Sequence, residues 1–271
     1  MNNATIVNAD DLGMTPGTNE AIFYGYDNGY ITHSSIMTNC DYFDDAIIGI
    51  KDRPSLKIGI HLNLTYGKAL NNNQLYCNKD GLFNLGYLQL IQKSTFSNIF
   101  LKEIRKELEF QIKKAIDNNI KITHIDSHRH VHLIPDIYKI VLELADKYNI
   151  PRVRLIKENI LNSIKITNKF NFIFNGGIIK YALLIFFTYI NVKKGDKYQN
   201  TLFFSILFTG VVDKYIFNKV LNTNNTDTNY EIVVHPSFVD KDMNISFYDK
   251  LEKIYRLSDD REIELKAILK E

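Results

Sequence analysis

The sequence is organised around one polar stretch, Thr123-His124-Ile125-Asp126-Ser127-His128-Arg129-His130-Val131-His132. Four of the seven histidines of the chain lie in it. Asp126 and three of these histidines occupy alternate positions, and an apolar strand-like run leads into them. A cluster of imidazoles with a carboxylate is typical of a site that binds a divalent metal ion or an anionic transition state. The rest of the chain can be understood by what it brings to this stretch.

The composition indicates a globular protein. Of its 271 residues, 45% are hydrophobic and 24% are charged, so the chain is long and apolar enough to bury a substantial core. The formal net charge of +2, with acids and bases interspersed, gives no reason to expect nucleic acid as a partner. Cys40 and Cys77 belong to no disulfide or metal-binding pattern, and Met1-Asn2-Asn3 begins no signal peptide. We therefore expect a cytoplasmic location.

Strand and helix signals alternate along the chain. Short β-rich runs predict about seven strands, at residues 4–8, 31–38, 56–62, 120–125, 151–155, 201–205 and 230–235. Helical signals predict helices at residues 16–29, 42–51, 100–116, 135–148, 210–221 and 259–269. Thr15 can cap the first of these helices, because Pro16 suits a first helical position. In the helix at 100–116, one apolar stripe is formed by Ile104, Leu108, Ile112 and Ile116.

Two segments interrupt this alternation. From about residue 65 to 98 the sequence is rich in Asn, Gly and Tyr and lacks a period, which is typical of a functional loop insertion. From about 157 to 200 a variable apolar segment predicts one or two helices. Its most apolar part, Ile178 to Val192, contains Lys180 and is shorter than the roughly 20 residues that cross a bilayer, so we expect no transmembrane segment. This part could instead close a core or a homodimer interface.

The order of these elements predicts an α/β fold. Strands that alternate with helices, without internal repeats or a linker, favour a single domain over residues 1–271 with a parallel sheet. In such folds the chemistry gathers at the carboxyl ends of the strands. Four predicted strand ends carry polar groups: Asp10 with Asp11, His61, Asp126 with His128, and His235. This coincidence favours a distorted (β/α) barrel with about seven parallel strands over a Rossmann sheet.

These strand-end residues supply the parts of a hydrolytic metal site. Such a site needs two or three fixed nitrogen or oxygen ligands, an open position for water or substrate, a base and an acid. Asp11, His61 and His128 can supply the ligands. Asp10 and His235 remain for proton transfer. Imidazole and carboxylate bind Zn²⁺ and other divalent ions, so the pattern leaves the identity of the ion open.

The polar groups lie in four motifs that can be compared with known families. They are Asn8-Ala9-Asp10-Asp11-Leu12-Gly13, Gly59-Ile60-His61-Leu62-Asn63-Leu64-Thr65, the stretch from Thr123 to His132, and Glu231-Ile232-Val233-Val234-His235-Pro236. In order and approximate spacing they resemble the YdjC-like carbohydrate deacetylases, of which the chitooligosaccharide deacetylases are the best known. The resemblance spans nearly the whole chain and is more specific than any single motif. One departure is Ser237, where the family commonly has Gly.

The resemblance implies a distorted (β/α) barrel related to the polysaccharide deacetylases. It also implies one divalent ion, Mg²⁺ or Zn²⁺, and hydrolysis of the amide bond that joins an acetyl group to an N-acetylated sugar. The metal ligands implied for this chain are Asp11, His61 and His128. Asp10 would act as the general base. His235 would act as the general acid that protonates the departing amine.

Four further residues are expected to support the site. Asp126 would orient a ligand imidazole, as carboxylates next to metal-bound histidines commonly do. Arg154, on the next predicted strand, would contact substrate or steady the base. His130 and His132 would contact substrate or support the ligands from behind. None of these four is needed as a metal ligand.

The substrate is less determined than the reaction. The resemblance implies an oligosaccharide that contains N-acetylglucosamine, such as diacetylchitobiose. The apolar segment from about residue 157 to 200 leaves a lipid-linked amino sugar open as an alternative substrate. A metal-dependent phosphoesterase on a similar barrel would use the same ligand types, but it usually needs more cationic charge than these motifs provide. A carbohydrate-binding protein without activity would have no use for two strand-end carboxylates together with a histidine.

Overall fold

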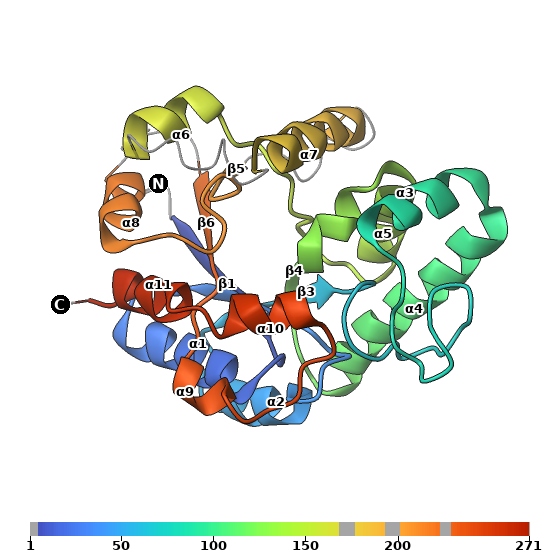
Figure 1. Cartoon of the computed structure of the whole chain (residues 1–271), viewed down its shortest axis with the longest axis horizontal. Coiled ribbons are helices and arrows are strands. Elements are labelled where there is room, and N and C mark those ends of the chain that lie inside the picture. The colour runs from blue at the N-terminus through green and yellow to red at the C-terminus, as the bar shows by residue number, and fades with distance from the viewer. Residues whose placement is uncertain (1–4, 168–176, 193–200, 223–228, 271) are drawn as a thin grey trace.

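The computed structural model describes residues 5–167, 177–192, 201–222 and 229–270. A parallel β-sheet forms its centre, and helices surround that sheet (Figure 1). The strands within these ranges are β1 (Ile6–Leu12), β2 (His33–Ile36), β3 (Lys57–Leu62), β4 (Ile122–Ser127), β5 (Thr201–Phe204) and β6 (Asn229–Val234). The helices are α1 (Pro16–Asn28), α2 (Phe43–Lys51), α3 (Tyr87–Phe96), α4 (Asn98–Asp117), the 3₁₀ helix η1 (His128–Leu133), α5 (Pro135–Lys147), α6 (Ile160–Thr167), α7 (Gly177–Val192), α8 (Lys214–Leu221), α9 (Val239–Asp242), α10 (Lys250–Arg256) and α11 (Asp260–Ile268).

Neighbouring strands of the sheet all run parallel, in the order β4-β3-β2-β1-β6-β5. The curled sheet is a half-barrel, because β4 and β5 stand at the two ends of this order and do not pair with each other in the described residues. The register brings His61 of β3 opposite Asp126 of β4, and Ala9 of β1 opposite Val234 of β6. The predicted distorted (β/α) barrel is confirmed. Parallel pairing also sets the carboxyl ends of these strands at one rim, where ligands bind in such folds.

The described residues contain six strands, where about seven were expected. The strand predicted at 151–155 is reduced to one bridge, in which Val153 pairs with Ile125 of β4. Two backbone hydrogen bonds of 2.8 Å flank this bridge. Pro151 has no N–H with which to extend the ladder in the other direction. The bridge is nevertheless sufficient to hold Arg154 beside the carboxyl end of β4.

The first strand and helix follow from local sequence signals. Thr15 caps α1 by accepting a hydrogen bond of 3.1 Å from the Thr18 N–H, and Pro16 occupies the first position, as predicted. β1 is longer than the predicted run at 4–8, because it continues to Leu12. The two acidic residues of its motif therefore lie within the last part of the strand and not in a turn after it.

The apolar stripe predicted for residues 100–116 is confirmed for most of α4. Ile104, Leu108 and Ile112 are buried in the main core, where α4 packs against β3 and α5. Ile116, in the last turn of the helix, is 39% exposed. Burial of each large aliphatic side chain stabilises the fold by about 1.5–3 kcal/mol relative to its exposure. This stripe therefore anchors α4 on the outer side of the sheet.

The insertion predicted from about 65 to 98 contains a helix, α3, which its polar sequence did not reveal. The irregular part before α3 is attached to α4 through a buried carboxylate. Glu107 accepts hydrogen bonds from the N–H groups of Leu70 at 3.1 Å and Asn71 at 2.7 Å. These bonds satisfy backbone donors that would otherwise lack partners in a loop without regular structure.

The apolar segment predicted from about 157 to 200 forms α6 and α7 where it is described, and its residues 168–176 and 193–200 lie outside the described ranges. Among the helices of the described ranges, none is sufficiently long and apolar to cross a bilayer. Glu158 holds this segment to the barrel, since its carboxylate accepts hydrogen bonds from Ser163 Oγ at 2.8 Å and the Ile206 N–H at 2.7 Å. Burial raises the pKa of Glu158 from 4.5 to about 7, against the effect of these bonds.

The raised pKa of Glu158 predicts a pH-dependent stability. The folded state keeps the proton between pH 4.5 and about 7 while the unfolded state releases it, so this group destabilises the fold as pH rises through that window. We expect Glu158→Gln to raise the free energy of unfolding at pH 8 by up to about 3 kcal/mol and to have little effect below pH 4.5. Urea unfolding of both proteins at the two pH values checks this. An equal difference at both values would contradict it.

Candidate active site

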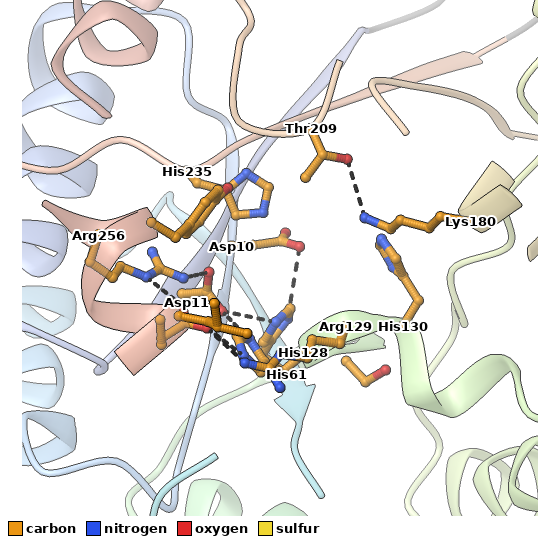
Figure 2. A pocket seen from close by; sticks show the side chains of 14 residues that line it. Asp10, Asp11, His61, His128, Arg129, His130, Lys180, Thr209, His235 and Arg256 are labelled. Atoms are coloured by element: carbon orange, nitrogen blue, oxygen red, sulfur yellow. Dashed lines mark hydrogen bonds and ion pairs between the residues drawn. The ribbon is translucent and has the colours of Figure 1, made fainter. Parts of the chain in front are cut away.

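A cavity of about 330 Å³ lies at the carboxyl rim of the sheet. Its wall includes every residue predicted to bind metal or to move a proton: Asp10, Asp11, His61, His128 and His235 (Figure 2). These side chains come from β1, from β3 and from the segments that directly follow β4 and β6. The carboxyl ends of the strands therefore bring together residues that are more than 220 positions apart in the sequence.

An irregularity in β1 lets two consecutive acidic residues face the same cavity. Neighbouring side chains of a regular strand point to opposite sides of the sheet. In β1 the pairing with β2 shifts register between Ala9 and Leu12, and Asp11 has a positive φ of 70°. Such a bulge changes the direction of the side chains next to it. Asp10 and Asp11 consequently both line the cavity, although their partners differ.

Asp11, His61 and His128 form a compact, buried group of possible ligands. Their ligand atoms lie within 4.8 Å of one another. Asp11 Oδ1 is 3.2 Å from His61 Nε2 and 3.0 Å from His128 Nδ1. His128 reaches this position through η1, in which the two residues that follow it adopt left-handed backbone angles. Backbone strain of this kind is commonly retained where a side chain must be held in place for function.

The chemistry of this group fits a divalent cation. One carboxylate and two imidazoles are a common ligand set for Zn²⁺ and related ions. His128 Nε2 is buried without a hydrogen-bond partner in the described part of the chain, although a carboxylate oxygen of Glu252 lies 3.5 Å away. Burial lowers the pKa of His61, but the carboxylates of Asp126 and Asp10 outweigh it and raise the pKa to about 10. A metal ion bound at His61 must therefore displace a proton.

Asp126 fixes the orientation of His61. Its Oδ1 lies 2.7 Å from His61 Nδ1, which is also 3.2 Å from Ser35 Oγ. With Nδ1 engaged in this way, Nε2 is directed at Asp11. The predicted contact between Asp126 and a candidate ligand imidazole is therefore present. Such carboxylate contacts increase the basicity of the histidine and define its tautomer.

Asp10 is held by Arg154, whose side chain is completely buried. The guanidinium donates to both oxygens of the Asp10 carboxylate, with two distances of 2.8 Å. It also reaches Asp126 Oδ2 at 2.6 Å and Glu231 Oε1 at 2.8 Å. Burial alone would raise the pKa of Asp10, but Arg154 and then His61 hold it well below its usual range. Arg154 thus contacts Asp10, one of the two roles expected for it.

His235 follows β6 directly and lies against Tyr255, with the ring centroids 5.9 Å apart. Its backbone N–H donates to Glu264 at 2.6 Å, whereas its Nδ1 is buried and has no hydrogen-bond partner among the described residues. Burial lowers the pKa of His235 to about 3, although the carboxylates of Asp10 and Asp11 oppose this effect. The imidazole is therefore neutral before substrate binds, and its Nδ1 lies 3.8 Å from a carboxylate oxygen of Glu264.

The last two histidines of the polar stretch have different surroundings. His130 lines the cavity and lies edge-on against Phe203, at 6.3 Å between ring centroids. His132 is buried behind the wall, where Nδ1 is 2.5 Å from Ser127 Oγ and Nε2 is 3.0 Å from the Arg154 carbonyl oxygen. His130 can therefore contact a ligand, and His132 supports the segment that carries Arg154.

Helix α10 completes the wall with four residues that no sequence motif indicated, among them the charged pair Glu252 and Arg256. Arg256 is fully buried and forms an ion pair with Asp11 Oδ2, and its Nε donates to Glu252 Oε1 at 3.0 Å. This pairing leaves Asp11 Oδ1 for the two histidines. In the sequence, Glu252 and Arg256 have the spacing of an ordinary exposed helical ion pair. What distinguishes them from such a pair is their closeness to Asp11 and His128 in the folded protein, which the sequence does not give.

Comparison with known proteins identifies the family. A family model described as YdjC-like protein matches residues 4–271. A carbohydrate deacetylase of Clostridium beijerinckii is 34% identical over 184 residues, which are 66% of this chain and 73% of that protein. A carbohydrate deacetylase of Thermoanaerobacter pseudethanolicus is 29% identical over 255 residues, 93% of this chain and 88% of that protein.

Two further proteins are similar to this chain, one in sequence and one in fold. A chitooligosaccharide deacetylase of Citrobacter koseri is 32% identical over 204 residues, 73% of this chain and 79% of that protein. The crystal structure of a putative cellobiose-phosphate cleavage protein from Enterococcus faecalis is similar in fold, with a TM-score of 0.64 and 22% identity over 99% of this chain and 91% of that one. With a family match along almost its entire length, this chain belongs to the YdjC-like protein family.

Proposed function

We propose that this protein is a metal-dependent carbohydrate N-deacetylase that removes the acetyl group of an N-acetylated sugar. The observation that carries the proposal is the convergence of a carboxylate and two imidazoles with a second carboxylate and a third imidazole in one cavity. The family match and the names of the relatives, carbohydrate deacetylase and chitooligosaccharide deacetylase, support the same reaction. The substrate we propose is an N-acetylglucosamine oligosaccharide such as diacetylchitobiose.

The cavity suits a small ligand with one reactive group. Its volume of about 330 Å³ is near the lower end of the roughly 300–1,000 Å³ found for small-molecule sites. An acetamido group can therefore enter it with the sugar unit that carries it, while further units remain outside. His130 on the wall offers a polar edge for sugar hydroxyl groups.

We assign Asp11, His61 and His128 as the residues that would hold the metal ion, Mg²⁺ or Zn²⁺. When bound, such an ion supplies the Lewis acidity that makes water nucleophilic near neutral pH and polarises a carbonyl group. Asp126 keeps His61 Nε2 available by engaging Nδ1. Arg256 engages one oxygen of Asp11 and so favours binding through the other.

Asp10 is the proposed general base. Because Arg154 keeps its pKa low, Asp10 is ionised at neutral pH and can accept a proton from the attacking water. Arg154 also holds the carboxylate in one orientation through two hydrogen bonds. A fixed orientation reduces the entropy that must be lost when the reacting groups meet. The low pKa makes Asp10 a weak base. It can therefore take a proton only from a water molecule whose own pKa is lowered, which is the effect that a bound ion would supply.

His235 is the proposed general acid. The water oxygen adds to the acetyl carbonyl carbon, and the carbon–nitrogen bond then breaks to release acetate. The departing nitrogen needs a proton, which His235 donates; the proton that reaches His235 is the one that Asp10 accepted from the water, so both groups return to their starting protonation states. The nearby carboxylates of Asp10 and Asp11 favour the protonated form of His235 even though burial opposes it. The net reaction is the addition of one water across the amide bond.

The proposed activity can be tested directly. We expect acetate release from diacetylchitobiose, loss of that activity after treatment with a chelator, and recovery when Mg²⁺ or Zn²⁺ is added back, because both ions accept this ligand set. Acetate is measured directly, with p-nitrophenyl phosphate as a parallel substrate. Hydrolysis of the phosphate ester without any acetate release from acetylated sugars would instead indicate a phosphoesterase.

Two variants separate metal binding from proton transfer. We expect His235→Ala to retain its metal content and to lose roughly 10²- to 10⁴-fold in kcat, as is typical for removal of a general acid. Asp11→Asn, which keeps the size of the side chain and removes its charge, is expected to weaken metal binding instead, because a neutral amide is a poorer ligand. Calorimetric titration with the metal and steady-state kinetics measure the two effects. Loss of metal binding in His235→Ala would contradict the assignment.

A further inference from the structure

A second cavity, of about 510 Å³, lies beside the candidate active site. It is bounded by residues 65–67 and 82–86 of the insertion after β3, and by residues 248–250 where α10 begins. Arg129 belongs to the walls of both cavities (Figure 2). We call this second cavity the side cavity. None of the residues proposed to bind metal or to move a proton lines it, so the chemistry of the active site does not explain it.

The wall of the side cavity contains an aromatic ring that is held in place. The hydroxyl group of Tyr248 lies 3.0 and 2.8 Å from the two carboxylate oxygens of Asp41, to which it donates. The Tyr248 ring meets Tyr66 edge-on, at 5.6 Å between ring centroids, and a Cβ added at Gly67 would lie 3.5 Å from two of its carbons. Tyr248 is nevertheless 39% exposed. A fixed and exposed aromatic ring offers a flat apolar surface on which the C–H face of a sugar can pack.

Polar groups with further hydrogen-bonding capacity also line the side cavity. Thr65 is one of them, and its Oγ1 is buried without a partner among the described residues. Asn78 Oδ1 accepts two backbone N–H groups at 2.9 Å, which leaves its amide nitrogen to donate to a ligand. Arg129 donates through Nη2 to Asp249 at 3.0 Å and to Glu252 at 3.2 Å, and a guanidinium has further N–H donors. An aromatic wall with a few polar groups is typical of a small-molecule site.

The side cavity and the active-site cavity are adjacent. The ring of Tyr66 lies between them, because its centroid is 6.0 Å from that of His128 and 5.6 Å from that of Tyr248. The active-site cavity, at about 330 Å³, accommodates one sugar unit with its acetamido group. A second unit, joined to the first by a glycosidic bond, must therefore lie next to that cavity. The side cavity has this position, and its volume is within the range found for small-molecule sites.

We propose that the side cavity binds a second sugar unit of an oligosaccharide substrate, while the unit that loses its acetyl group occupies the active-site cavity. The apolar face of the second unit packs on Tyr248, and its hydroxyl groups bond to Arg129 and Asn78. The insertion after β3 then serves to recognise a chain of at least two sugars. This inference rests on the proposed deacetylase function, because it concerns the substrate of that reaction.

The test compares acetate release from diacetylchitobiose and from N-acetylglucosamine. We expect the unchanged protein to have the higher kcat/KM for the disaccharide. Tyr248→Ala is expected to reduce this preference roughly 10- to 100-fold, mainly through KM, because the lost contact is remote from the bond that breaks. Tyr248→Phe keeps the ring and should retain most of the preference. Asn84→Trp, which places an indole at the wall of the side cavity, is a second variant should Tyr248→Ala fail to fold.

The matched control is Tyr215→Ala, since Tyr215 lies on α8, is 51% exposed and lines neither cavity. It should keep the preference of the unchanged protein. Equal losses on both sugars in Tyr248→Ala, or no preference in the unchanged protein, would overturn the proposal. If neither sugar releases acetate, the proposed function fails instead, and calorimetric titration with diacetylchitobiose decides on the side cavity. Binding that Tyr248→Ala weakens would then support it, whereas no binding, or binding that this variant retains in full, would overturn it.

Discussion

The candidate site depends on one buried cation. The guanidinium of Arg154 joins Asp10, Asp126 and Glu231, three carboxylates that would otherwise repel one another in a region shielded from water. Removing one partner from such a buried charge network typically costs about 3–5 kcal/mol, because the remaining charges are left without compensation. The network therefore sets the geometry of the site before any metal or substrate is bound. Its stability comes from the fold as a whole, since Arg154 reaches the rim through a single bridge to β4.

Two arginines give different environments to two adjacent acids. Arg154 engages both oxygens of Asp10, so this carboxylate is oriented and ionised but remains outside the group formed by Asp11, His61 and His128. Arg256 engages one oxygen of Asp11, and the other faces the two histidines. Neighbouring residues of one strand can thus have separate functions, because each is held by a cation from a different part of the chain. The register shift in β1 makes both positions accessible from the same cavity.

The sequence was sufficient to predict which motif residues meet, because in a parallel sheet strand ends share one rim. It was not sufficient for the wall that α10 provides. Arg256 contacts Asp11 across 245 positions, and its pairing with Glu252 has the same spacing as many exposed ion pairs. The strand predicted at 151–155 illustrates a different limit. Its residues have the right character for a strand, but only Val153 finds a partner, and pairing depends on neighbours that local sequence does not define.

The central claim is that Asp11, His61 and His128 bind the metal ion. A second buried group, in which His61 is shared with Asp10 and Asp126, has a similar compactness and is the strongest competitor. Anomalous X-ray diffraction from crystals soaked with Zn²⁺ distinguishes the two directly, because it locates the ion. The account predicts one anomalous peak within about 2.0–2.2 Å of His61 Nε2, one nitrogen of His128 and Asp11 Oδ1. A peak between Asp10, His61 Nδ1 and Asp126 would contradict it.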